Sequence, residues 1–178
     1  MGFHHVALAT RDAMANHDFY TRAMGFRLVK VEPGRTPEGG RAKHLFYDTG
    51  GGGMIAFWEI QDDNLPDDWS PAISTGLGLP EWANHLAWEA ADLEDIKRHR
   101  ERWLACGHDV VEIDHRWCVS IYTRDPNGIM VEWCTSTQEL TDEDAREALT
   151  LLDDPEPEPK EPPSIQVHRA GPRENEGG

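Results

Sequence analysis

The sequence predicts an α+β protein made of two βαβββ modules whose sheets curl around a shared cavity. The order of strand and helix patterns between about residues 3 and 60 recurs between about residues 83 and 137. The halves also share short stretches: His5-Val-Ala matches His85-Leu-Ala, and Gly53-Met-Ile-Ala-Phe-Trp58 matches Gly128-Ile-Met-Val-Glu-Trp133. A supersecondary unit used twice signals a repeat architecture. One such unit leaves a sheet face uncovered, so the two must pack around common space.

The first module begins with a strand over 3–10, where apolar and polar residues alternate. Asp12 is the expected N-cap of a helix that ends at Gly25. Its predicted apolar stripe consists of Met14, Phe19, Tyr20 and Ala23. Strands follow over 26–31, 43–49 and 54–60, and we expect a mobile loop over 32–41 because it holds two prolines and three glycines.

A connection over 61–82, rich in Pro, Asp and Gly, leads to the second module. This module has a strand over 84–89, a helix between Asp92 and Gly107, and strands over 109–113, 117–123 and 129–134. Asp125-Pro-Asn-Gly128 carries the residues of a tight turn between the last two strands. The segments 34–41 and 61–82 are candidate lids or partner contacts.

Residues 1–137 thus form the predicted domain, and two further segments follow it. Thr141-x-x-Asp144 is a variant of the capping box and predicts a helix within 138–152. Residues 153–178 are acidic and proline-rich, so we expect a tail that is disordered or lies along the surface.

Charge and cysteine usage exclude several classes of partner. The formal net charge is −16, and the last part of the chain from Gln138 holds 12 acidic and 4 basic residues. An acidic chain without a basic patch argues against nucleic acid and against anionic membranes as partners. The three cysteines have no metal-binding spacing, which fits free thiols in a reducing compartment. Neither a signal peptide nor a membrane span is evident, so we expect a cytoplasmic protein.

Three residues point to a metal site. Glu132 lies in an otherwise apolar strand, where a carboxylate is costly to bury without a partner. The repeat places His5 and His85 at equivalent points on the first strand of each half, and all three residues fall on one side of their strands. Two imidazoles and one carboxylate that leave open positions form the facial triad of non-heme Fe(II) oxygenases. In the first half Phe57 matches Glu132, so three protein ligands are expected unless Glu59, two residues further on, reaches the metal.

Four stretches together resemble the vicinal oxygen chelate superfamily, which includes glyoxalase I, bleomycin-resistance proteins and type I extradiol dioxygenases. They are Phe3-His-His-Val-Ala-Leu, Phe19-Tyr-x-x-x-Met-Gly-Phe-Arg-Leu, Asn84-His-Leu-Ala-Trp and Ser120-Ile-Tyr-Thr-Arg-Asp-Pro-Asn-Gly-Ile-Met-Val-Glu. The resemblance covers about residues 3–137. It implies paired βαβββ modules around a divalent metal that chelates two neighbouring substrate oxygens, and it implies a homodimer. The metal expected from the dioxygenases is Fe(II), with Mn(II), Zn(II), Ni(II) and Co(II) as alternatives.

The same resemblance suggests catalytic residues. In the extradiol dioxygenases a tyrosine ten residues before the glutamate hydrogen-bonds a substrate oxygen, and Tyr122 has that spacing to Glu132. Those enzymes place a histidine nine residues before the tyrosine, where this chain has Ile113. His115 and His44 are therefore the two candidates for the general base, and His44 aligns roughly with Ser120 of the second half.

The sequence favours a dioxygenase-like, ring-cleaving oxidoreductase acting on a small vicinal diol or catechol-type substrate. A glyoxalase-like lyase or isomerase would need a fourth ligand, which Phe57 does not provide. A thiol transferase of the fosfomycin-resistance type would use the same three ligands, but no basic cluster suited to a phosphonate is evident. A non-catalytic small-molecule-binding protein, resembling the bleomycin-resistance proteins, would not need a metal triad.

Overall fold

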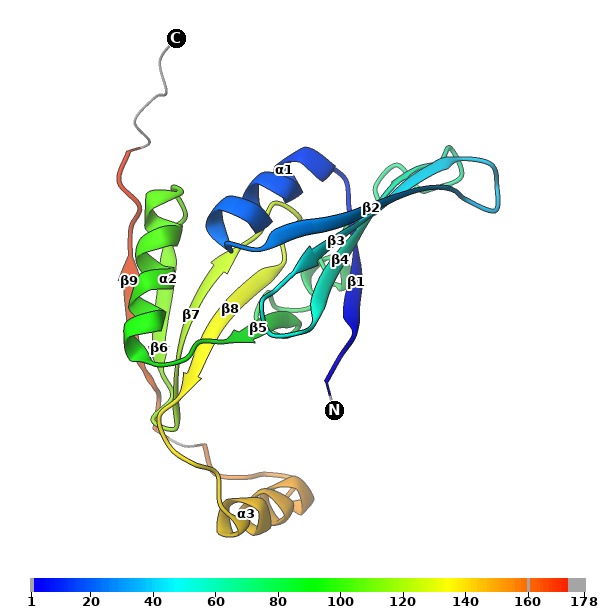
Figure 1. The fold of residues 1–178 in the computed structure, drawn as a ribbon. Coiled ribbons are helices and arrows are strands. Elements are labelled where there is room, and N and C mark those ends of the chain that lie inside the picture. Colours follow the sequence, from blue (N-terminus) through cyan, green and yellow to red (C-terminus); the bar gives the residue numbers. More distant parts are fainter. Residues whose placement is uncertain (1, 160, 173–178) are drawn as a thin grey trace.

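The computed structural model describes residues 2–159 and 161–172, which form two modules and a C-terminal extension (Figure 1). Each module has the predicted βαβββ order, so the α+β fold is confirmed. Within these residues, no helix is long and apolar enough to cross a membrane.

Module one contains a four-stranded sheet in the order β1-β4-β3-β2, in which β1 and β4 run parallel. Its elements are β1 (His5–Thr10), α1 (Ala13–Asp18), the π-helical turn η1 (Phe19–Ala23), β2 (Arg27–Arg35), β3 (Arg41–Asp48) and β4 (Met54–Gln61).

The helix of module one begins where Asp12 caps it. The Asp12 carboxylate accepts hydrogen bonds from the backbone N–H groups of Met14 and Ala15, both at 2.9 Å. Phe19 and Tyr20 are buried as predicted, but Met14 is 74 % exposed, so its place in the apolar stripe was wrong. The buried face of the helix starts at Ala13 and continues at Asn16, and Met14 lies outside it.

The predicted loop over 32–41 is instead mostly part of a hairpin. β2 continues to Arg35, which pairs with Arg41 at the start of β3, so only residues 36–40 form the turn. Pro33 is tolerated because β2 is the edge strand of its sheet. The hairpin reaches beyond the rest of module one (Figure 1).

Module two contains a five-stranded sheet in the order β5-β8-β7-β6-β9. Its own elements are β5 (His85–Glu89), α2 (Leu93–Ala105), β6 (Val110–Asp114), β7 (Cys118–Arg124) and β8 (Met130–Ser136). The connection between the modules contains one short 3-10 helix, η2 (Thr75–Leu77). Arg11 holds this connection by donating to the carbonyls of Trp69 and Asp67.

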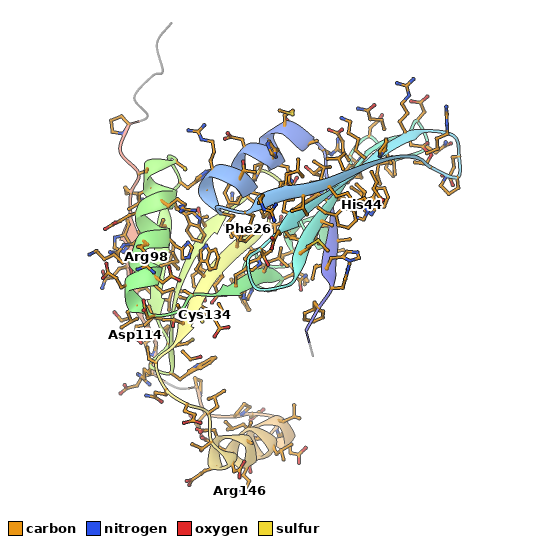
Figure 2. The ribbon with its side chains drawn as sticks, viewed as in Figure 1. Phe26, His44, Arg98, Asp114, Cys134 and Arg146 are labelled. Carbon is orange, nitrogen blue, oxygen red and sulfur yellow. The ribbon has the colours of Figure 1, made fainter. Side chains whose placement is uncertain are left out.

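The two modules pack through their helix-bearing sides. The Phe26 ring centroid lies 5.3 Å from that of Trp88 and 6.0 Å from that of Trp133 (Figure 2). Tyr20 and Trp103 are fully buried in the same apolar cluster. Because side chains alternate along a strand, the opposite face of each sheet points away from this shared core.

The C-terminal extension contains a helix and a strand. Helix α3 (Asp142–Asp153) starts with the predicted capping box, in which the Thr141 hydroxyl accepts from the Asp144 N–H. β9 (Ser164–His168) pairs antiparallel with β6 and becomes the edge strand of the second sheet. Of the two expectations for the tail, disordered or lying along the surface, these residues follow the second, as an exposed strand at the edge of the sheet. The part of the predicted tail at 160 and 173–178 lies outside the described residues.

Candidate metal centre

Five of the six predicted site residues lie on the two open sheet faces, and the sixth, His115, lies in the turn between β6 and β7. His85 and Glu132 come from neighbouring strands of the second sheet, because β5 and β8 pair in parallel with Ala87 opposite Glu132. Tyr122 lies opposite Glu132 on β7, and the chain brings His115 beside it. His5 and His44 lie on the open face of the first sheet.

His85 and Glu132 form the centre of the module-two cluster. The His85 Nε2 and Glu132 Oε2 atoms are 3.0 Å apart, and Glu132 is 5 % exposed. The other ring nitrogen, Nδ1, lies 2.9 Å from the Trp82 carbonyl oxygen. A hydrogen bond from Nδ1–H to that carbonyl fixes the ring and directs Nε2 toward the carboxylate, so that Nε2 could give its lone pair to a metal held by both groups, as metal-binding histidines commonly do.

Tyr122 and His115 extend this cluster. The Tyr122 hydroxyl donates to Glu132 Oε1 at 3.1 Å, and His115 Nε2 lies 3.1 Å from the Tyr122 oxygen. Since the tyrosine hydrogen is used toward the carboxylate, His115 Nε2 is the donor in this pair. Burial, and then the Glu132 charge, raise the pKa of Tyr122, which therefore stays protonated at neutral pH.

The turn between β6 and β7 holds His115 in position. Its backbone N–H donates to the Cys118 carbonyl at 2.9 Å. The next residue, Arg116, has a φ of 75°, and the Asp114 carboxylate accepts its N–H at 2.7 Å. A non-glycine residue in the left-handed region carries strain that its surroundings must offset.

The module-one cluster is built around His44. Its ring stacks on Trp58 with centroids 3.8 Å apart, and the His5 ring lies at 6.1 Å (Figure 2). His44 Nε2 is buried, with no hydrogen-bond partner among the described residues. Burial, and then the proximity of His5, lower the pKa of His44, so its imidazole is neutral at pH 7.

The two clusters do not converge within one chain. Over residues 2–159 and 161–172, no group of three or more His, Cys, Asp or Glu side chains could hold a metal ion. A cavity of about 760 Å³ between the modules is lined by His4, Val6 and His85. His4 and Val6 flank His5 in the chain and project to the side opposite to it, so the His5 side chain points away from this cavity. One chain thus offers two ligand-type atoms at His85 and Glu132, and His5 lies on a different open face.

The strand registers correct the match between the halves. His5 pairs with Met54 and His85 with Met130, so the equivalent of Glu132 is Ala56, one residue before Phe57. A one-residue slip moves every side chain to the other face. Phe57 is accordingly buried in the core, whereas Ala56 lies on the face of His5.

Glu59 does not point to the His5 face. Its Oε1 atom accepts the backbone N–H of Ala13 at 2.9 Å, and its Oε2 atom lies 2.8 Å from Lys43 Nζ. These partners belong to the helix side of the sheet. The expected equivalence of His44 and Ser120 holds, because His44 pairs with Trp58 and Ser120 with Cys134 at corresponding points of the two sheets.

Two polar groups near the site were missed by the sequence analysis. Cys118 and Cys134 interact with each other, and burial followed by the hydrogen bond with Cys134 raises the pKa of the Cys118 thiol to about 12. Their spacing of 16 residues resembles no motif, but both fall on the same side of their strands as Tyr122 and Glu132. Alternation along the two strands was the signal that could have found them.

These features define an α+β protein with repeated βαβββ modules and a histidine–carboxylate pair on an open sheet. Residues 2–133 match the Glyoxalase/Bleomycin resistance protein/Dioxygenase superfamily, and the chain belongs to it. Members of this superfamily are generally metal-dependent, bind small molecules and often form dimers. No curated protein matches significantly.

Solved structures support the same fold. A glyoxylase/bleomycin resistance protein/dioxygenase domain from Frankia sp. EAN1pec has a TM-score of 0.59 at 20 % identity, with 76 % of this chain and 98 % of that chain covered. A lactoylglutathione lyase from Agrobacterium tumefaciens gives 0.52 at 22 %, covering 75 % and 92 %. A fosfomycin resistance protein from Listeria monocytogenes gives 0.53 at 18 %, covering 77 % and 94 %. At these identities the likeness concerns the fold alone.

Proposed function

We propose that this chain is a metal-dependent enzyme whose site is completed between two copies. His85 and Glu132 of one copy would join His5 of the other, with Fe(II) as the preferred metal and a vicinal diol or catechol as substrate. The observation that carries the proposal is the His85–Glu132 pair on an open face, 3.0 Å between Nε2 and Oε2. Two copies are needed because His5 lies on a different sheet face from His85 and Glu132, and the described residues of one chain bring no three ligands together.

The residues present fit a divalent metal in their chemistry. Two ligand atoms about 2.1 Å from a metal, at adjacent corners of an octahedron, are about 3.0 Å apart. Imidazole and carboxylate together suit Fe(II) and leave open positions for substrate. Such a metal would supply Lewis-acid activation of two neighbouring substrate oxygens and the redox chemistry required by O2.

The protein's own groups support a proton transfer at this site. His44 is the better of the two candidate bases, because its Nε2 atom has no partner and its lowered pKa keeps it neutral. A base must reach the proton that it accepts, so this role requires the His44 ring to turn its buried Nε2 atom toward the substrate hydroxyl. His115 already uses its Nε2 atom toward Tyr122, so it acts as a positioning residue. Tyr122, kept protonated, would donate to the resulting substrate oxyanion beside Glu132.

The number of ligands supports a dioxygenase-like oxidoreductase over a lyase or isomerase. The latter would need a fourth ligand from module one, and alanine stands at the position equivalent to Glu132. Glu59, the other carboxylate of that strand, is bound to Lys43 and to the N–H of Ala13. A thiol transferase would use the same three ligands and is separated from the dioxygenase by the assay below.

The test is metal content after anaerobic purification, together with O2 uptake on catechols. Wild type should hold about one iron per chain and consume O2 with substrate. Glu132→Ala should lose both the iron and the O2 uptake. Glu89→Ala is the matched control and should lose neither, because Glu89 is a carboxylate on the same sheet face that lies opposite Cys134 instead of beside the ligands. Bound nickel, zinc or manganese without O2 uptake would favour the isomerase or transferase. Absence of metal binding would indicate a non-catalytic binding protein.

A mixing experiment tests whether the site spans two copies. In a heterodimer of His5→Ala with Glu132→Ala, one site collects both substitutions and the other stays intact. Random exchange of an equal mixture makes about half of the dimers heterodimers, each with one intact site of two, so mixing the two inactive variants should restore metal binding to about a quarter of the wild-type content. A site made within one chain would show no restoration, and that result would refute the two-copy arrangement.

A further inference from the structure

Strand β9 lies in the part of the chain that the superfamily match does not include. The match ends at residue 133, and β9 spans Ser164–His168. β9 adds a fifth strand to the sheet of His85 and Glu132 and forms its outer edge beyond β6 (Figure 1). The extension therefore changes the same face that carries the candidate metal centre.

Cross-strand pairing places β9 residues in line with the site. Val167 pairs with Val111, Val111 with Tyr122, Tyr122 with Glu132, and Glu132 with Ala87. Residues directly opposite each other on neighbouring strands project from the same face. One row of side chains thus runs across all five strands, from Val167 to the strand that carries His85.

A second row runs parallel to the first. Ile165 pairs with Ile113, and Ile113 with Ser120, which pairs with Cys134. At the β9 and β6 ends, both rows are entirely aliphatic. Ile165 is 58 % exposed and Val167 is 52 % exposed. We call these four residues, Ile165, Val167, Val111 and Ile113, the aliphatic strip.

Strand spacing gives the position of the strip relative to the carboxylate. Neighbouring strands are about 4.8 Å apart, so Tyr122 lies about 5 Å from Glu132 along the sheet, Val111 about 10 Å, and Val167 about 14 Å. A small diol bound at Glu132 would reach Tyr122 but would leave β9 uncovered. A molecule with an apolar tail directed along the row would cover the strip.

We propose that β9 is the distal wall of the substrate site and binds the apolar tail of an elongated vicinal diol. This inference rests on the proposed function, since it places the two oxygens of the ligand at the Glu132 end of the row. The continuity of the strip with the Tyr122–Glu132 row is the reason for assigning it to a ligand of the site. Substrate choice then depends on tail length, which β9 sets.

A homologous series of catechols measures this length dependence. 4-Methylcatechol would stop near Tyr122, whereas the chain of 4-hexylcatechol would reach β9. Both are titrated calorimetrically into anaerobic, metal-loaded protein. Wild type should bind the hexyl compound at least tenfold more tightly, because each methylene buried on an apolar surface adds to affinity. The Ile165→Ser/Val167→Ser double variant should lose most of that ratio and keep the affinity for 4-methylcatechol.

Two controls separate the wall from the integrity of the strand. Gln166→Ser changes the residue between them, which faces the other side of β9, and should leave the ratio unchanged. Ile165→Val/Val167→Ile retains the aliphatic surface and should also preserve it. If the Ser variant loosens β9, Val167→Ala decides the matter, because it removes only two methyl groups from the strip and should lower the ratio by a smaller factor; an unchanged ratio in this variant would refute the wall.

Each remaining outcome overturns the inference in a different way. Equal affinity of wild type for both catechols, or a ratio that survives the Ser substitutions, refutes the distal wall and leaves the proposed function intact. Binding of neither catechol by metal-loaded protein refutes the proposed substrate class and the inference together. Conversion of a dimer to a monomer by the Ser substitutions, measured by light scattering, would assign the strip to contact between copies instead.

Discussion

The Tyr20 hydroxyl is the best single place to perturb the junction between the modules. It donates to Asp125 Oδ2 at 3.0 Å, across 105 positions of sequence, and both residues are buried. Asp125 also accepts the side-chain N–H of Asn127 at 2.8 Å and the backbone N–H groups of Asn127 and Ile129 at 2.9 and 2.8 Å. Tyr20→Phe removes one of these four donors without changing the shape of the ring.

The expected loss follows from the charge of the acceptor. A hydrogen bond to an ionised group contributes about 1.5–3 kcal/mol to stability. Because Asp125 keeps three donors after the substitution, we expect a loss of about 2 kcal/mol in the free energy of unfolding. For a chain of this size that corresponds to a decrease of about 4–8 °C in Tm.

Denaturant unfolding, followed by tryptophan fluorescence, measures this loss. Tyr47→Phe is the matched control, since Tyr47 is as buried as Tyr20, and its hydroxyl lies beside the Asn16 amide and 3.5 Å from His17 Nδ1, at the limit of hydrogen bonding. The control should lose about 1 kcal/mol or less. If Tyr20→Phe were no more destabilised than Tyr47→Phe, the Tyr20–Asp125 bond would not hold the modules together.

Further predictions concern protons, a thiol and a turn. Burial raises the pKa of Asp125 in the folded protein. The free energy of unfolding of wild type relative to Asp125→Asn should therefore be largest below a pH of about 3.9, decrease as the pH rises through the raised pKa of the folded state, and then level off. A difference that stays constant between pH 3 and 8 would contradict this. The Cys118 thiol, with a pKa raised to about 12, should be labelled by iodoacetamide at pH 8 at least tenfold more slowly than in the denatured chain, as mass spectrometry of the labelled peptide can show. Gly25→Ala should cost about 1–2 kcal/mol because φ is +77°, whereas Gly34→Ala, with no atom within 4 Å of the added methyl, should change stability by less than about 0.5 kcal/mol in the same melts.

The fold was predictable because its signals are local and repeated. Asp12 and Asp92 cap their helices, and Gly25 and Gly107 end them with positive φ. These choices depend on a few neighbouring residues, so they can be read from sequence. The network of Tyr20 and Asp125 could not, because nothing local links two residues that meet only after both modules have formed.

The register of β4 shows why the match between the halves slipped. The sequence aligns Gly53 with Gly128, because each precedes an apolar pair. In the structure Gly52, with φ of 83°, is the equivalent of Gly128, with φ of 78°. Four successive glycines all permit a left-handed conformation, so composition cannot say which one adopts it. Because of this ambiguity, the sequence alignment matched Phe57 with Glu132, whereas the structure matches Ala56 with it.

The site was predictable to the level of strand and face, but not to the level of the assembly. Alternation put His85 and Glu132 on one side of adjacent strands, and they do meet. The joint placement of His5 with them, and the ligand role of all three, stay predictions, because they depend on how copies associate. The sequence analysis missed β9 because prolines and charged residues dominate the rest of the tail. Within β9, Ile165 and Val167 alternate with polar residues, as strand residues do.

The packing of the two modules through their helix-bearing sides has a consequence for the symmetry of the proposed dimer. Each chain presents one face with His5 and His44, where Glu32 of the edge strand β2 lies opposite His44, and one face with His85 and Glu132. The proposed ligand set of His5, His85 and Glu132 therefore needs two unlike faces. Only unlike faces are complementary, and a two-fold axis closes such a pair into a dimer with two equal centres. In the proposed dimer the stoichiometry would be one metal per chain, although the ligands of each metal would come from both chains. Without that closure, the same complementarity would join chains end to end into an open polymer.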